Sequence, residues 1–268
     1  MKKTSLLAFI FIVISAFSIL SKEKPTLYLI GDSTVAEGSG NNGLWGWGKF
    51  LPLFFDTSKL TICNYAVGGT STRTFQTNGI WDKSLNKKGM WDTVYSKLKK
   101  GDYMMIQFGL NDQSPVDDST RSRGTLQGIG EDSIIILNKV TNEVETVHSF
   151  GWYLRKFIVD AKAKGATVIV CSSIPRNSWK DGKLKRGEYG FANWALQIAQ
   201  QENVYSIDLN NRIADVYDQE GEAIVTTKYH SNKDNTHTVQ AGSILNASLV
   251  VEGIKALDKC KLKKYLIK

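Results

Sequence analysis

Five short apolar runs are spread along the chain, and each ends in polar residues or glycine. The runs are rich in Val, Ile and Tyr, and their apolar character is nearly continuous. Such runs are typical of strands that are buried on both faces, as in a parallel sheet. The pattern therefore predicts strands over residues 26–30, 60–65, 103–108, 167–171 and 204–207.

The segments between these runs repeat apolar residues at spacings of three and four, as one face of a helix does. Alternating strands and helices favour an α/β fold: a three-layer α/β/α sandwich around a doubly wound, five-stranded parallel sheet. Ligands of such sheets bind beyond the carboxyl ends of the strands, so chemistry is sought directly after each apolar run. The predicted helices cover 47–55, 90–98, 149–164, 189–201 and 238–257.

One segment, residues 113–148, interrupts this alternation. It contains DSIIILNKVTNEVETVHSF, in which two apolar–polar runs flank Asn138–Asn142. That pattern predicts a β-hairpin, which we place in an insertion at about 125–148. Because the insertion follows the third strand, it either shapes the rim of the substrate cleft or is a surface excursion. The sequence shows no internal repeat and no second domain.

The N-terminus has the pattern of a secretory signal peptide. Lys2 and Lys3 precede the apolar run Leu6–Leu20, and small residues follow it. The run is short for a membrane span, which needs about 20 apolar residues, although an uncleaved anchor is the alternative. We therefore expect a signal peptide over 1–21 and an exported protein, periplasmic or extracellular, formed by residues 22–268. No stable membrane association is expected after cleavage.

Charge and cysteine content exclude some partners. The formal net charge is +8, and loss of two lysines with the signal peptide lowers it to +6. No dense Lys/Arg block with interleaved aromatic residues is present, so no nucleic-acid partner is expected. Cys63, Cys171 and Cys260 are too far apart for a zinc knuckle, and one disulfide among them is possible in an exported protein.

The first strand is followed by Gly31-Asp32-Ser33-Thr34. Glycine permits a sharp turn, and a serine there would point into the crevice beyond the sheet. A helix N-terminus at this point would stabilise negative charge. Ser33 is therefore a candidate nucleophile, although this short motif alone also fits an ordinary turn.

The next two strands are followed by candidate oxyanion donors. Gly68 and Gly69 after the second strand let a backbone N–H approach a ligand closely, and Asn111 after the third carries an uncharged side-chain donor. Each has a plainer interpretation as a turn residue, and the Asn111-Asp112 pair is typical of turns.

A carboxylate and an imidazole stand three residues apart in Asp234-Asn235-Thr236-His237, ahead of the last predicted helix. Asp234 can accept the Nδ1 proton of His237, which leaves Nε2 free to take a proton from a serine. His148 and His230 lack such a neighbour, so we expect them to be structural or peripheral. The three histidines lack metal-ligand spacing, and no metal site is predicted.

The order of these four motifs gives them their specificity. GDSTVAEG, NYAVGGTSTRTF, IQFGLNDQ and DNTHT resemble the SGNH (GDSL-type) hydrolase superfamily, and within it the rhamnogalacturonan acetylesterases. The similarity continues through SPVDD, GWYLRKFI and AKGATVIVCSSIPRN. It implies a flavodoxin-like SGNH fold, with a Ser33–His237–Asp234 triad and an oxyanion hole formed by Ser33, Gly69 and Asn111. One departure is Leu110, where this family usually has histidine, and it affects the expected substrate detail more than the reaction type.

The resemblance implies a serine esterase that removes acetyl groups from pectic polysaccharide, above all rhamnogalacturonan, without metal or organic cofactor. The alternatives are an SGNH esterase acting on another acetylated polysaccharide such as xylan, a short-chain lipid or thioester hydrolase, and a non-catalytic carbohydrate-binding protein. We expect a monomer whose positive charge suits a galacturonate-rich polymer.

Two candidate substrate contacts have competing interpretations. Arg73 either meets a uronate carboxylate or forms a structural salt bridge. Trp45, in Trp45-Gly46-Trp47, either stacks on a sugar ring or packs in the core under the first helix.

Overall fold

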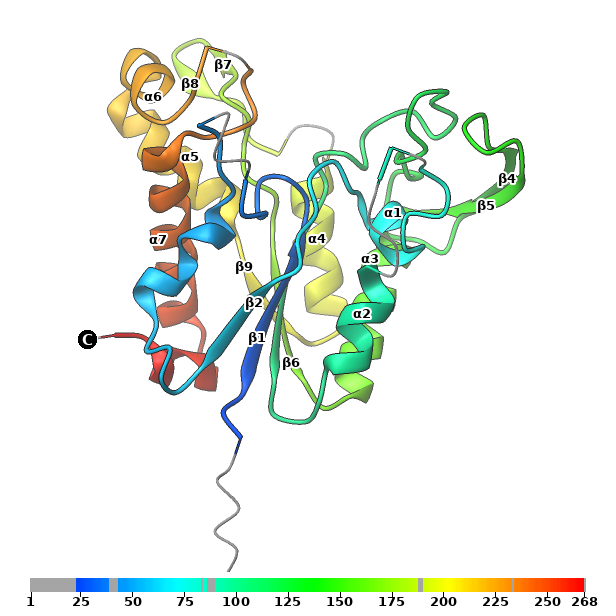
Figure 1. The fold of residues 1–268 in the computed structure, drawn as a ribbon. Coiled ribbons are helices and arrows are strands. Elements are labelled where there is room, and N and C mark those ends of the chain that lie inside the picture. Colours follow the sequence, from blue (N-terminus) through cyan, green and yellow to red (C-terminus); the bar gives the residue numbers. More distant parts are fainter. Residues whose placement is uncertain are drawn as a thin grey trace, which may run out of the picture.

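A computed structural model describes residues 23–38, 43–82, 84–85, 90–187, 190–232 and 234–267; the predicted signal peptide lies outside this part. The described chain is built around a five-stranded, all-parallel sheet with the order β2-β1-β3-β6-β9 (Figure 1). The order reverses beside β1, which confirms the predicted doubly wound topology. The strands are β1 (Thr26–Gly31), β2 (Thr61–Asn64), β3 (Tyr103–Gln107), β6 (Thr167–Cys171) and β9 (Tyr205–Ile207).

Both faces of the sheet are buried, which explains why its strands are nearly continuous apolar runs. In β1, Leu27 and Leu29 enter one core and Tyr28 and Ile30 enter the other, because successive side chains of a strand point to opposite faces. Figure 1 shows the resulting three layers. The first core is covered by η2 (Trp47–Lys49), η3 (Leu51–Phe54), α5 (Leu209–Glu220) and α7 (Gln240–Ala256), and the second by α1 (Thr72–Gln76), α2 (Met90–Lys97), α3 (Phe150–Ala163) and α4 (Phe191–Gln201).

The helix predicted over 47–55 is wrong in type. The structure has two short 3₁₀ helices there, because Gly48 disfavours a helix interior and Pro52 removes a backbone donor. The predictions for α2, α3, α4 and α7 agree with the structure within two residues at each end. In the described part of the chain, three α-helices were not predicted from the sequence, namely α1, α5 and α6 (Glu222–Lys228), and neither was the short 3₁₀ helix η5 (Lys261–Tyr265).

Residues of the insertion form the hairpin β4 (Ser133–Leu137) and β5 (Val144–His148), with antiparallel pairing of Ile134 with Val147. The hairpin projects from the side of the domain in Figure 1. Val147 and Glu145 face inward, whereas Ile135 is exposed.

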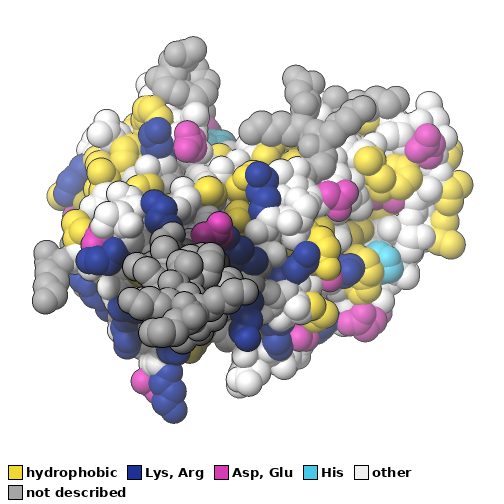
Figure 2. All heavy atoms as spheres, turned by 60° about the horizontal axis from the view of Figure 1, so that its bottom comes forward, with side chains coloured by type: hydrophobic (Ala, Val, Ile, Leu, Met, Phe, Trp, Pro, Cys, Tyr) yellow, Lys and Arg dark blue, Asp and Glu magenta, His cyan; other side chains and the backbone are white. Residues whose placement is uncertain are grey.

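None of the helices in the described part of the chain is long and apolar enough to cross a membrane. All three cysteines are free thiols, and burial raises the pKa of Cys171 to about 12. Figure 2 shows the end of the molecule at which the sheet strands begin, and many Lys and Arg side chains gather there.

Candidate active site

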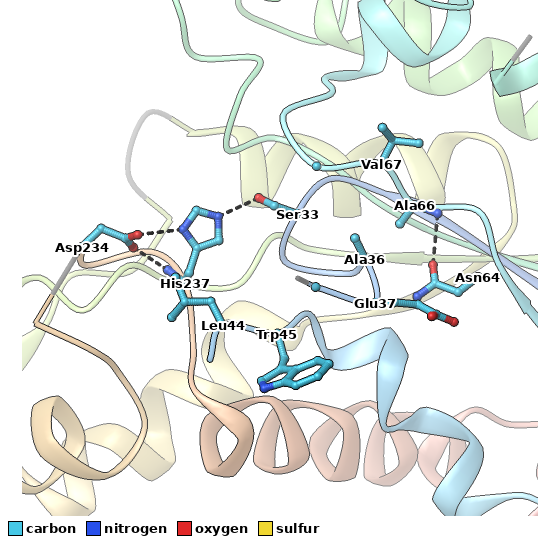
Figure 3. Close-up of a pocket in the computed structure, with 12 residues that line it drawn as sticks. Ser33, Ala36, Glu37, Leu44, Trp45, Asn64, Ala66, Val67, Asp234 and His237 are labelled. Atoms are coloured by element: carbon cyan, nitrogen blue, oxygen red, sulfur yellow. Dashed lines mark hydrogen bonds and ion pairs between the residues drawn. The ribbon is translucent and has the colours of Figure 1, made fainter. Parts of the chain in front are cut away.

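Ser33, His237 and Asp234 form a continuous hydrogen-bonded chain beyond the carboxyl end of β1 (Figure 3). His237 Nε2 lies 2.8 Å from Ser33 Oγ, and Nδ1 lies 2.9 Å from Asp234 Oδ2. The serine is 204 residues from the histidine in sequence, so the fold alone creates this contact. An imidazole between a carboxylate and a hydroxyl is placed to act as a general base toward that hydroxyl.

The turn after β1 holds Ser33 at the rim of the sheet. The Asp32 carbonyl accepts hydrogen bonds from the N–H groups of Val35 and Ala36, and the Asp32 carboxylate accepts two more from Thr34. Asp32 is fully buried, and burial raises the pKa of its carboxyl. Ser33, by contrast, lines the open pocket.

Asp234 orients His237 through two points. Its Oδ2 meets the imidazole, while its Oδ1 accepts hydrogen bonds from the backbone N–H groups of His237 and Thr236 at 2.7 and 2.8 Å. Partial burial would raise the pKa of Asp234, but these hydrogen bonds outweigh it and lower the pKa. The carboxylate therefore stays ionised and stabilises an imidazolium on its neighbour.

The loop after β2 is fastened to the serine turn. Asn64 Nδ2 donates to the Val35 carbonyl at 2.8 Å, and the Val67 N–H donates to the Gly31 carbonyl at 3.0 Å. Gly68 lines the pocket, and a Cβ added there would lie 3.7 Å from the Ser33 Cβ. Gly69 follows with a φ of +80°, which glycine adopts readily.

The loop after β3 is joined to the loop of Gly68 and Gly69 by two polar side chains, the half-buried Asn111 and the buried Asp112. Asn111 Nδ2 donates to the Thr70 carbonyl at 2.8 Å, next to Gly69, and its second hydrogen is left for another acceptor. Asp112 accepts hydrogen bonds from the backbone and hydroxyl of Thr72 and from the Gly109 N–H. Among the described residues, no acceptor contacts the N–H groups of Ser33 and Gly69, as an oxyanion hole requires.

An arginine that the sequence did not single out lies against Gly69. Arg121 Nη2 donates to the Gly69 carbonyl at 3.0 Å, and Arg121 Nε donates to Asp82 at 3.0 Å. Asp82 is fully buried, so it anchors the guanidinium. Arg121 lies in an irregular loop, and its spacing from the sequence motifs gives no sign of a role in the site. Only its tertiary contact with Gly69 shows that it belongs there.

The triad opens into a pocket of about 710 Å³ whose wall includes Trp45 (Figure 3). The Trp45 carbonyl accepts hydrogen bonds from the hydroxyls of Thr238 and Ser243, which fix it beside the histidine loop. Trp47 is buried instead, and its Nε1 donates to Gln107 at 2.8 Å. Of the two interpretations of this segment, the pocket contact therefore applies to Trp45, and packing in the core applies to Trp47.

The interpretation of Arg73 as a substrate contact is wrong. Its side chain is fully buried, donates to both oxygens of Glu145, and also donates to the carbonyls of Val116 and Gly124. Glu145 belongs to β5, so the hairpin secures α1 through this ion pair. No described residue of the insertion is among those that line the pocket beside Ser33.

The other two histidines are not part of this hydrogen-bonded series, although His230 lies close enough to Asp234 and His237 to interact with them electrostatically. His148 stacks on Trp152 with ring centroids 3.8 Å apart, and His230 is buried beside the Tyr217 hydroxyl. The described residues contain no cluster of His, Cys, Asp and Glu that could hold a metal ion.

Known proteins share the family and the fold of this chain. Residues 29–242 match the GDSL-like lipase/acylhydrolase family. A rhamnogalacturonan acetylesterase of Emericella nidulans is 29% identical over 91% of this chain and 90% of its own length. The rhamnogalacturonan acetylesterase RhgT of Bacillus subtilis is 28% identical over 92% of this chain and 97% of its own. The crystal structure of the B. subtilis YxiM protein superposes with a TM-score of 0.66 and 26% identity, covering 87% of this chain and 56% of that one. The chain therefore belongs to the GDSL-like lipase/acylhydrolase family and is a carboxylic ester hydrolase.

Proposed function

We propose that this hydrolase removes acetyl groups from pectic polysaccharide, in particular from rhamnogalacturonan, through an acyl-enzyme on Ser33. The observation that carries the mechanism is the hydrogen-bonded series from Asp234 through His237 to Ser33. The substrate is supported by the names of the two relatives, which cover nearly the whole chain at 28–29% identity.

In the first step, Ser33 Oγ attacks the acetyl carbonyl carbon while His237 Nε2 takes the hydroxyl proton. The charge that develops on the carbonyl oxygen is stabilised by the N–H groups of Ser33 and Gly69 and by Asn111 Nδ2. Collapse of the tetrahedral intermediate expels the sugar alkoxide, which receives the proton from His237. Asp234 stabilises the transient imidazolium.

In the second step, His237 deprotonates a water molecule that attacks the acetyl carbon bonded to Ser33. Acetate leaves and the proton returns to the serine oxygen. This scheme uses only side chains and backbone groups of the chain itself.

The shape of the pocket fits a sugar-bound acetyl group. A volume of about 710 Å³ is far larger than an acetyl group alone requires, and it falls in the range of small-molecule sites. The half-buried indole of Trp45 gives the pocket one flat apolar wall, on which a pyranose ring can stack.

The test is acetate release from a panel of acetylated rhamnogalacturonan, homogalacturonan and xylan, assayed with wild type, Ser33→Ala and the control Ser96→Ala. Ser96 lies exposed on α2 and donates only to the Thr93 carbonyl. We expect Ser33→Ala to lose on the order of a millionfold in turnover, and the control to lose nothing. Preference for xylan would refute the substrate, and an active Ser33→Ala would refute the mechanism.

A further inference from the structure

We propose that Trp47 and Gln107 are positioning residues for Ser33, which they hold through a directed set of buried hydrogen bonds. This inference rests on the proposed mechanism, because it concerns the placement of the same nucleophile. The hydrogen bonds run from Trp47 Nε1 to Gln107 Oε1 at 2.8 Å, from Gln107 Nε2 to Thr34 Oγ1 at 2.7 Å, and from Thr34 Oγ1 to Asp32 Oδ1 at 2.7 Å. We call these four residues the Trp47–Asp32 network.

The direction of these hydrogen bonds is fixed by the indole at one end. The Trp47 Nε1–H can only donate, so the atom of Gln107 that faces it is the amide oxygen. The amide nitrogen of Gln107 then donates to the Thr34 oxygen, and the hydroxyl hydrogen of Thr34 is left for Asp32. One donor therefore sets the donor and the acceptor of every contact in the network.

The network is closed to water, because each of its four residues is at most 3% exposed. Asp32 Oδ1 also accepts a hydrogen bond from the Thr34 backbone N–H at 2.9 Å, whereas Oδ2 is buried and no described residue hydrogen-bonds to it. The charges of Arg176 and of a protonated His237 act on this carboxylate as well. In the described structure, both hydrogen bonds that hold the Asp32 side chain therefore come from Thr34.

Ser33 lies between the two residues at which the network ends. Asp32 precedes it and Thr34 follows it, so the peptide units on both sides of the serine belong to residues that the network holds. The backbone N–H of Trp47 donates to the Thr34 carbonyl at 2.9 Å, and Trp47 thus holds Thr34 both directly and through Gln107. The position of the Ser33 N–H and Oγ depends on these contacts.

The network joins the serine turn to the middle strand of the sheet. Gln107 ends β3 and lies in register with Gly31 at the end of β1. The neighbours of Trp47 approach the serine turn closely, since a Cβ added at Gly46 or at Gly48 would lie 2.3 Å from a carbonyl oxygen of that turn. A nucleophile placed by a central strand is held more precisely than one placed by a loop alone.

The network should affect the chemical step and leave substrate binding unchanged. Trp47, Gln107 and Thr34 are not among the described residues that line the pocket beside Ser33. The proton transfer to His237 depends on its 2.8 Å contact with Ser33 Oγ. Displacing a reacting group by about 1 Å costs on the order of a hundredfold in rate. Loss of the network should therefore appear in kcat.

The test is hydrolysis of 4-nitrophenyl acetate by the full chain, with kcat and KM measured separately and thermal melting of each variant. Thr34→Val removes the hydroxyl and keeps the shape, Thr34→Ser keeps the hydroxyl, and Gln107→Met breaks the other two contacts. Trp47→Phe removes the indole donor. Its matched control is Trp91→Phe, because Trp91 is a buried indole on α2 that donates to Asp160 at 3.2 Å.

We expect Thr34→Val and Gln107→Met each to lower kcat by about tenfold to a hundredfold, with KM changed by less than about threefold. Thr34→Ser should keep kcat within about threefold of wild type. Because the contacts form one network, the double variant Thr34→Val/Gln107→Met should lose no more than the more impaired single variant. Trp47→Phe should lower kcat too, whereas Trp91→Phe should melt at a lower temperature than wild type and keep its kcat.

Four results would overturn the inference: a wild-type kcat in Thr34→Val or Gln107→Met, a loss that appears in KM, an equal loss in Thr34→Ser and Thr34→Val, and losses that multiply in the double variant. If Gln107→Met does not fold, the comparisons of Thr34→Val with Thr34→Ser and of Trp47→Phe with Trp91→Phe decide. An active Ser33→Ala would refute the proposed mechanism. An inactive Ser33→Ala beside network variants with wild-type kcat would overturn this inference alone.

Discussion

Replacing Gly69 by alanine tests whether the glycine loop is held rigidly for the oxyanion. The φ of Gly69 is +80°, so an alanine there adopts a left-handed conformation. An ideal Cβ at this position would lie 2.4 Å from Arg121 Nη1, 2.7 Å from Nη2 and 2.9 Å from Cζ. These distances are far below the contact distance, so the guanidinium must move away.

The loss of stability in Gly69→Ala can be estimated from these contacts. The left-handed conformation costs about 1–2 kcal/mol for a residue with a Cβ. Moving the guanidinium breaks the 3.0 Å bond to the Gly69 carbonyl and strains the 3.0 Å bond to buried Asp82, and charged hydrogen bonds are worth about 1.5–3 kcal/mol. Because 26% of the Arg121 side chain is exposed, water recovers part of that loss. We therefore expect the free energy of unfolding of Gly69→Ala to be about 2–4 kcal/mol below that of wild type, which lowers the Tm by about 5–15 °C.

Turnover should fall as well, because the N–H of residue 69 shifts with its loop. Displacing one oxyanion donor costs on the order of a hundredfold in kcat. The assay is hydrolysis of 4-nitrophenyl acetate below the Tm of the variant, together with thermal melting.

Gly68→Ala is the matched control. Its Cβ would meet only the Ser33 Cβ at 3.7 Å, an ordinary contact, and its φ is not positive. Its stability should stay within about 0.5 kcal/mol of wild type. If Gly69→Ala melts and turns over like wild type, or if both variants are destabilised equally, then Arg121 does not fix this loop.

Three further outcomes follow from individual contacts. Asp234→Asn should keep the fold and lower kcat on 4-nitrophenyl acetate by about 10²–10⁴-fold, because His237 loses its orienting carboxylate; an unchanged kcat would exclude the triad. Glu145→Gln should lower the free energy of unfolding in urea by about 3–5 kcal/mol, because it leaves the buried charge of Arg73 without a partner. The double variant Arg73→Met/Glu145→Leu should recover most of that stability. Equal stability of wild type, the single variant and the double variant would contradict this. Burial lowers the pKa of His230 from 6.5 to about 4. Between pH 4 and 6.5 the unfolded chain therefore binds more protons than the folded chain. The free energy of unfolding should fall by up to about 3 kcal/mol as the pH drops from 6.5 to 4. The urea midpoint of His230→Gln should vary less with pH over this window, and parallel curves would refute the assignment.

The sheet was predictable because its strands are buried on both faces, which leaves a local and nearly continuous apolar pattern. The hydrogen-bonded series of Asp234, His237 and Ser33 was predictable because Asp234 and His237 are three residues apart and Ser33 lies two residues after a strand. α1, in contrast, has only five residues, TRTFQ, too few to show a helical period. Its ion pair with the hairpin joins residues 72 positions apart, which no sequence spacing reveals.

Leu110, which stands where the resembled family usually has histidine, does not disturb the backbone of its loop. Its side chain packs against the core cluster under η2 and α7, while its carbonyl accepts a hydrogen bond from Gln113 Nε2 at 2.6 Å. The backbone geometry that positions Asn111 therefore does not depend on a polar side chain at position 110. An imidazole there would require a polar partner, whereas leucine requires none.

The four loops of the proposed active site are joined to one another by polar contacts. Asn64 joins the β2 loop to the serine turn, and Asn111 and Asp112 join the β3 loop to the glycine loop. Arg121 and Arg176 then tie Gly69 and Thr236 to their surroundings. Such contacts fix the donors before the charge develops, so reorganisation at the moment of reaction is avoided. Removing one of these contacts between loops should therefore lower kcat more than it raises KM. Removing a side chain of the pocket wall, such as Trp45, should raise KM more than it lowers kcat.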